Sequence, residues 1–278
     1  MVESFRASKR IVGTSAERLA TVEETATYST DFSSNTNWTE VGTGNITIDT
    51  SNSRLQYNCD HSGDDDAVVY DLQTTLGSGN NASNTAWIIR YKVNMSASNA
   101  PSFYAMPFLS SANIPMDTSS TADQLGIVAG ETGGGSGGAY LNIRYADGTT
   151  PYNGTYSGNT TSVMSNSTDY YITMKRHEGT KFTLEVRTGS HTGSHALGSP
   201  ITSTSIPSSV QDLRYLYFRD NNGSTHTRYL NSYIYDFEFY NNITSITKTA
   251  NIQTNSIWEE SDTGKHFIYD GSAWTEVA

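Results

Sequence analysis

The chain has 278 residues, of which 35% are hydrophobic and only 16% charged, and its formal net charge is −11. This length suits one large β domain or two modest ones, and the acidic balance argues against nucleic-acid binding, which needs clustered Lys and Arg. A single cysteine, Cys59, excludes an intrachain disulfide framework, and no apolar run approaches the about 18 residues of a membrane span, so we expect no membrane insertion.

Residues 1–24 form an arm in which basic side chains outweigh acidic ones as far as Arg18, and Ile11 and Val12 are its main apolar residues. The start lacks the apolar stretch of a secretory signal, so we expect synthesis in a cytosol. Because the rest of the chain is acidic, the arm is predicted to contact its own body or a neighbouring subunit; a solvated tail is the alternative. The residues predicted to make assembly contacts are Arg6, Lys9, Arg10, Ile11 and Val12.

Residues 25–245 alternate between β-rich runs and turns of Gly, Asn and Asp, and no run has a sustained helical period. About a dozen short strands at this spacing predict two packed antiparallel sheets. The predicted strands are 27–32, 45–50, 54–58, 67–72, 86–95, 102–109, 125–130, 139–146, 170–176, 181–188, 213–220 and 231–240.

The strongest local pattern is YYITMKRHEGTKFTLEVRTG, residues 170–189. Apolar side chains occupy every second position on both sides of HEGT, residues 177–180, whose Gly favours a tight reversal. The sequence therefore predicts a hairpin with one dry face. The residues expected on that face are Tyr170, Ile172, Met174, Phe182, Leu184 and Val186.

Residues 246–278 predict a three-strand meander, because SIWEE, HFIYD and AWTEV are separated by two turn signals. Its core would consist of Trp258, Phe267, Tyr269 and Trp274. Thirty residues bury little surface alone, so we expect this segment to dock on a neighbour or on its own copies. These four aromatic residues are also predicted assembly contacts.

The central segment resembles the concanavalin A-like lectin and glucanase superfamily, including laminin-G-like domains. The resemblance rests on the hairpin at 170–189, the DF opening near residue 31, the VVYDL strand and the closing YIYDFEFY strand. It implies an all-β fold, a two-sheet antiparallel jelly-roll sandwich, with the arm and the meander as appendages. It implies little about activity, because sites differ widely on one fold.

The meander's W…DTGKHFIYDGSAWTEV is similar to a short module near the ends of many bacteriophage and archaeal-virus fibre proteins. Aromatic and turn positions coincide in order and spacing, although NIQTNS replaces the Pro- and Gly-rich lead-in that often precedes the module. The arm's SKRIVGTSAER also looks like openings of marine viral structural proteins. These resemblances imply a protein of a virus particle.

Glycan-cleaving relatives of this fold use paired acidic residues or converging Arg, His and Tyr side chains. The nearest acidic pair here is Asp236 and Glu238 in YDFEFY, which alternation places on one face while Tyr235, Phe237 and Phe239 share the other. We interpret this pair as the wet side of an amphipathic strand. The lyase-type residues, without a QIH-like strand beside them, are Arg144 and Tyr145, or Arg214 and Tyr217. We therefore predict no catalytic residues and no enzyme.

Two segments contain metal-binding residue types. The cluster DHSGDDD places Asp60, Asp64, Asp65 and Asp66 in a loop, but its spacing matches no EF-hand, and a solvated loop is favoured over calcium binding. His191 and His195 in HTGSH supply only two zinc ligands without a helix to align them. No cofactor is predicted.

Glycan binding without catalysis needs only one or two aromatic rings on loops, with polar groups for sugar hydroxyls. Tyr152 and Tyr156, in DGTTPYNGTYSGNTT, are the candidates. The favoured hypothesis is a virion structural protein of fibre, receptor-binding or capsid-decoration type. It would form homo-oligomers, contact other virion proteins, and be exposed on the particle for adhesion to host-surface glycans or for shell reinforcement. The alternatives are a secreted carbohydrate-binding or adhesion protein and, third, a polysaccharide-cleaving enzyme.

Overall fold

The computed structural model describes residues 10–13, 25–59, 66–99, 104–113, 122–130, 138–148, 164–196, 199–203, 206–220, 229–246, 255–269 and 274–277. The chain divides into two compact units: Ala26–Thr244, and Met1–Thr25 combined with Ser245–Ala278. The two ends of the chain therefore belong to the same small unit, which we call the terminal unit. The larger unit is called the sandwich.

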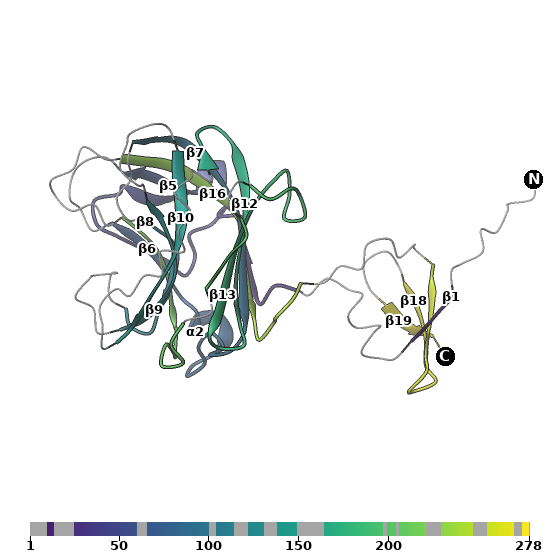
Figure 1. The fold of residues 1–278 in the computed structure, drawn as a ribbon. Helices are drawn as coiled ribbons and strands as arrows, with labels where there is room; N and C mark the ends of the chain where they lie inside the picture. Colours follow the sequence, from purple (N-terminus) through teal and green to yellow (C-terminus); the bar gives the residue numbers. More distant parts are fainter. Residues whose placement is uncertain are drawn as a thin grey trace, which may run out of the picture. The chain divides into compact units, whose positions relative to one another are not determined.

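The sandwich consists of two antiparallel sheets. The seven-stranded sheet has the order β11-β10-β9-β8-β15-β6-β3, formed by β3 Trp38–Val41, β6 Ala67–Asp71, β8 Tyr104–Ser110, β9 Asp123–Gly130, β10 Gly138–Asp147, β11 Met164–Ser165 and β15 Tyr215–Arg219. The eight-stranded sheet has the order β14-β13-β12-β7-β16-β5-β4, with β2 also paired to β16, formed by β2 Tyr28–Thr30, β4 Ile46–Asp49, β5 Arg54–Cys59, β7 Trp87–Asn99, β12 Asp169–His177, β13 Lys181–Thr188, β14 Ile201–Ser203 and β16 Tyr229–Asn241. Figure 1 shows β9 and β10 in one layer facing β12 and β13 in the other.

Helical structure in the described residues is limited to the 3-10 turn η1 (Thr50–Asn52) and the single-turn helix α2 (Gln73–Leu76). No helix in this part of the chain has the length and apolar character needed to cross a bilayer.

The predicted fold class, an all-β two-sheet jelly-roll sandwich with a small terminal meander, is confirmed, and each predicted run corresponds to a strand. Three strands of the sandwich, β3, β11 and β14, were not predicted from the sequence. These are short strands, and in β3 only Trp38 is buried while the next three residues are exposed. Without alternation over several residues, a strand of this kind leaves no periodic signal.

The core lies between the two sheets and is formed by side chains that alternate inward. The predicted hairpin is confirmed: β12 pairs with β13 from Tyr170–Thr188 to His177–Lys181, and all six predicted dry-face residues are buried. The chain reverses through Glu178 and Gly179, whose φ angles of 56° and 72° lie in the left-handed region.

Two tyrosines join the sheets across this core. The hydroxyls of Tyr57 on β5 and Tyr91 on β7 donate to the carbonyl oxygens of Ala105 and Met106 on β8. Burial raises the pKa of Tyr91 well above its usual value, so its hydroxyl stays protonated and can only act as this donor in the core. The bonds fix the position of one sheet relative to the other.

The terminal unit is a four-stranded sheet in the order β1-β17-β18-β19, with β1 Arg10–Gly13, β17 Ile257–Glu260, β18 His266–Tyr269 and β19 Trp274–Val277. β17 to β19 form the predicted antiparallel meander. β1 adds a parallel strand, with Ile11 opposite Trp258. The indole of Trp274, itself half-buried, packs 5.8 Å from the ring of Trp258 and 5.1 Å from that of Tyr269.

Candidate functional site

Strand β16 is interrupted by a bulge. Its pairing with β7 shifts register between Tyr235 and Glu238, and Asp236 has a left-handed φ of 53°. On the other side of β16, β5 pairs as far as Ile234 and β2 takes over from Phe237. An inserted residue of this kind bends the strand and re-aims side chains.

The bulge corrects one prediction about this strand. Strict alternation predicted that Tyr235 shares one face with Phe237 and Phe239. Phe237 and Phe239 are buried in the core, but Tyr235 is not on their face. It lies half-buried on the outer surface, where the Lys92 ammonium sits 4.6 Å from its ring centre. The extra residue shifts the alternation by one position.

The segment that follows β2 forms the second side of the site. Thr30 Oγ1 accepts a hydrogen bond from the N–H of Phe32 (2.9 Å), and Asp31 Oδ1 accepts one from the N–H of Ser33 (2.9 Å). Phe32 is fully buried, with a left-handed φ of 60°. The ring of Phe32 thus anchors a tight turn whose hydroxyl-bearing residues lie beside β16.

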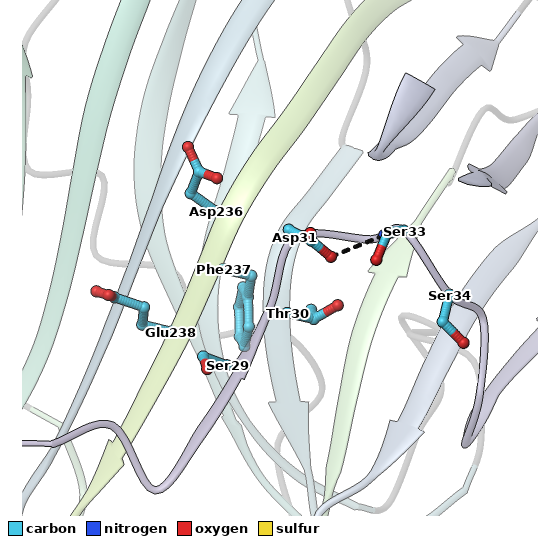
Figure 2. Close-up of a pocket in the computed structure, with 8 residues that line it drawn as sticks. All are labelled: Ser29, Thr30, Asp31, Ser33, Ser34, Asp236, Phe237 and Glu238. Carbon is cyan, nitrogen blue, oxygen red and sulfur yellow. Dashed lines mark hydrogen bonds between the residues drawn. The ribbon is translucent and has the colours of Figure 1, made fainter. Parts of the chain in front are cut away.

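Between this turn and β16 lies a cavity of about 470 Å³, which we call the bulge pocket. Figure 2 shows the segment from Ser29 to Ser34 running beside β16, from which Asp236 and Glu238 project. A volume in this range suits a small ligand. The lining residues are Ser29, Thr30, Asp31, Ser33, Ser34, Asp236, Phe237 and Glu238.

Glu238 is held in place from one side. Its Oε2 accepts hydrogen bonds from Arg90 Nε at 2.8 Å and from the Tyr240 hydroxyl at 3.1 Å, and it forms an ion pair with Arg90 Nη2 at 2.7 Å. Its Oε1 has no hydrogen-bond partner among the residues that the structure describes. The Arg90 guanidinium and the Tyr240 hydroxyl therefore occupy one oxygen of Glu238 and leave the other as a hydrogen-bond acceptor.

The other two carboxylates of the pocket are also acceptors. Asp236 is exposed, in agreement with the predicted wet face, and has no partner in the described part of the chain. The hydroxyl and N–H of Ser33 hold the pKa of Asp31 below its ordinary value. The residues that line the pocket therefore include three with carboxylates, Asp31, Asp236 and Glu238, beside serine and threonine residues. Over the described residues, no group of His, Cys, Asp or Glu side chains is arranged to hold a metal ion.

The two histidines of HTGSH lie on the outer face of the eight-stranded sheet and have different partners. His191 Nδ1 is 3.2 Å from Thr173 Oγ1, whereas His195 Nε2 is 3.7 Å from a carboxylate oxygen of Glu185. Burial, with the nearby charges of Arg90 and Arg187, lowers the pKa of His191 to about 4. His191 is therefore a neutral, packed side chain at pH 7.

The residue pairs considered for lyase chemistry do not converge. Arg144 is buried on the outer face of the seven-stranded sheet, while Tyr145 packs against the core on the opposite face. Arg214 forms an ion pair with Asp71 (2.5 Å). The Tyr217 hydroxyl donates to Asn113 Oδ1 in the loop after β8, and burial raises the pKa of Tyr217.

Several predicted site residues lie outside the described residues: Tyr152, Tyr156, Asp60, Asp64, Asp65, Arg6 and Lys9. Asp66 is described and fully buried. It accepts hydrogen bonds from Asn45 N (2.7 Å), from Thr43 Oγ1 (3.1 Å) and from Thr43 N, so it fastens the loop before β4.

The remaining predicted assembly residues all lie in the terminal unit. Arg10, Ile11 and Val12 form most of β1, and Val12 is 61% exposed. Trp258, Phe267 and Tyr269 are buried in the same sheet, and Trp274 is half-buried.

No protein-family model and no curated protein matches this sequence. Among solved structures, the carbohydrate recognition domain of Emp47p matches with a TM-score of 0.51 and 13% identity, over 80% of this chain and 98% of that chain. The CBM2 module of the evolved Dit of Lactobacillus casei BL23 phage J-1 has a TM-score of 0.48 and 11% identity, over 81% and 99%. A mutant of alginate lyase Aly36B matches with a TM-score of 0.46 and 11% identity, over 73% of this chain and 87% of that chain. The Emp47p likeness shows the fold, a lectin-like jelly-roll sandwich.

Proposed function

We propose that this protein binds glycans without cleaving them, and that it does so in the bulge pocket. The observation that carries the proposal is the set of three carboxylates and several hydroxyls lining one cavity on a lectin-like sandwich. Sugar hydroxyls are donors that such carboxylates accept, and charge-assisted hydrogen bonds are the stronger kind. Asp31 and Asp236 would face the ligand from two segments that are distant in sequence.

Binding without cleavage is favoured by the contacts of Glu238. Hydrolysis by a carboxylate pair needs both carboxylates at the glycosidic bond, whereas Glu238 is turned towards Arg90 and Tyr240, which both bond its Oε2. Tyr152 and Tyr156 are retained in the proposal as aromatic contacts for a bound glycan. Their role is tested by the Ala variants of both residues on a glycan array, where unchanged binding would exclude it.

We further propose that the chain is a virion structural protein, made in the host cytoplasm and exposed on the particle as a fibre, receptor-binding or capsid-decoration subunit. Support comes from the similarity of the C-terminal meander's sequence to the module of viral fibre proteins, and from the division of the chain into a sandwich and a terminal unit. That unit would make the contacts with copies of the chain and with other virion proteins, leaving the sandwich for host-surface glycans. A secreted cellular adhesion protein is the alternative.

Two experiments test these proposals separately. Glycan-array screening of the intact protein and of its Asp236→Asn variant is expected to give binding that the variant loses; equal signals would exclude the bulge pocket. Electron microscopy of native particles, with labelling by an antibody against the sandwich, is expected to place the protein on the particle surface. Labelling only of cell surfaces or secreted material would favour the alternative.

A further inference from the structure

A second cavity of about 540 Å³ lies between the segment from Leu76 to Asn84 and residues brought in from elsewhere in the chain, and it shares no lining residue with the bulge pocket. Asp212, just before β15, and Asn242, just after β16, complete its wall. Half of the ten lining residues are asparagines, so we call it the amide pocket.

Three of these amides have their orientation fixed by one hydrogen bond each. Asn80 Nδ2 donates to Leu76 O at 2.9 Å, which leaves its Oδ1. Asn81 Oδ1 accepts from Gln73 Nε2 at 3.1 Å, and Asn84 Oδ1 accepts from Asp212 N at 2.9 Å, which leaves both Nδ2 groups. None of the three remaining ends has a partner within the described ranges. The backbone partners assign which end of Asn80 and Asn84 is oxygen, whereas the assignment of Asn81 follows that of the Gln73 amide with which it pairs.

The backbone around the amide pocket is fixed as well. Asn241 Oδ1 accepts from Ser83 N at 2.7 Å, and Leu213 O accepts from Ala82 N at 2.8 Å. Asp212 and Asn242 have left-handed φ angles of 54° and 60°, a conformation that Asp and Asn tolerate better than most residues. The polar groups are therefore held in place before any ligand arrives, which lowers the entropy cost of binding.

We propose that the amide pocket is a second binding site, for one neutral sugar residue. Asn80, Asn81, Asn84 and Asp212 line a space of ligand size with amide donors, an amide acceptor and a carboxylate, and a sugar hydroxyl both donates and accepts. The half-buried side chain of Leu76 supplies an apolar contact for the C–H face of a ring. None of the described lining residues is Lys, Arg or His. An anionic sugar would therefore find no positive charge in the pocket and would lie beside the carboxyl group of Asp212.

The test is an NMR titration of the intact, ¹⁵N-labelled protein with the methyl glycosides of galactose, glucose and mannose. At least one is expected to shift the amide signals of residues 80–84 and 212, with a Kd of about 1–10 mM. Asp212→Asn keeps the left-handed backbone but removes the negative charge and replaces one acceptor oxygen with a donor, and we expect it to weaken this binding at least about tenfold. Asn80→Ala, a second exposed variant, is expected to weaken it too.

Asp31→Asn, in the bulge pocket, is the matched control and should leave the amide-pocket shifts unchanged, so the two sites can fail independently. The proposal is overturned if no glycoside shifts these signals at about 100 mM, well above the expected Kd. It is also overturned if both amide-pocket variants titrate like the parent protein, or if Ca²⁺ alone reproduces the shifts, which would indicate a cation site.

Discussion

The sandwich and the terminal unit reach stability by different routes. The sandwich encloses a core supplied by the inward faces of two sheets, with residues such as Leu184 and Ile172 fully buried. The terminal unit has short strands of four residues, and the buried apolar side chains among its described residues are Trp258, Phe267 and Tyr269. It also needs both ends of the chain, because β1 pairs with β17. The sandwich therefore tolerates the loss of one contact better than the terminal unit does.

Trp258→Ala should have the largest effect, because it removes a central ring of a very small core. Aromatic-to-alanine changes in cores cost about 3–5 kcal/mol, which a sheet of this size does not have in reserve. Hydrogen-exchange mass spectrometry should show β17–β19 unprotected and β12–β13 unchanged. The exposed Thr275→Ala is the control, and protected β17–β19 strands in the Trp258 variant would refute the idea of a separate aromatic core.

Leu184→Ala should destabilise the sandwich by about 2–5 kcal/mol without unfolding it, because the cavity is surrounded by a larger core. Urea denaturation followed by hydrogen exchange in β12 and β13 measures this free energy of unfolding. The exposed Thr39→Ala should change it by less than about 0.5 kcal/mol. Equal effects of the two substitutions would contradict the burial of the hairpin's dry face.

Asp66→Asn should cost less, about 1.5–3 kcal/mol, because it replaces a buried carboxyl group that accepts hydrogen bonds from two backbone N–H groups. The side-chain NH2 group of the new asparagine would then face the backbone N–H of Thr43 or of Asn45, and two donors cannot form a hydrogen bond. Thermal unfolding measures the loss, and exchange of residues 42–45 locates it. An unchanged melting temperature would show that this buried carboxylate does not fasten the loop.

The smallest expected effect concerns His191. Its pKa is about 4 in the folded chain against an ordinary value of 6.5, so the unfolded chain binds more protons between these values. The contribution of the neutral His191 side chain to the free energy of unfolding is fully present above pH 6.5 and is lost as the pH falls towards 4. His191→Gln should therefore flatten the fall in stability between pH 6.5 and 4, measured by urea denaturation at each pH. Parallel profiles for the two proteins would contradict a buried, neutral imidazole.

Local alternation made much of the fold predictable. The hairpin at 170–189 has period-2 apolar residues on both strands and a glycine turn, so sequence and structure agree residue by residue. The pairing of Ile11 with Trp258 had no such signal, because it joins segments from opposite ends of the chain. Short strands without alternation, such as β3, were missed for the same reason.

The candidate site was less predictable than the fold. Asp236 and Glu238 were recognised as an exposed acidic pair, but the bulge that aims them was not, because nothing in YDFEFY marks an inserted residue. Asp31 was noted only as part of a strand opening. It comes beside Asp236 through the pairing of β2 with β16, which spans about 200 residues of sequence and depends on tertiary structure.

The central claim is that carboxylates of the bulge pocket bind sugar hydroxyls. Isothermal titration of the intact protein with an array-selected glycan tests it most directly, comparing the parent chain with the Asp31→Asn, Asp236→Asn double variant. Glu276→Gln, an exposed carboxylate of the terminal unit, is the matched control. We expect the double variant to bind at least about 100-fold more weakly, since each charge-assisted bond is worth about tenfold or more, and the control to bind normally. Equal affinity of the double variant and the parent protein would contradict the account.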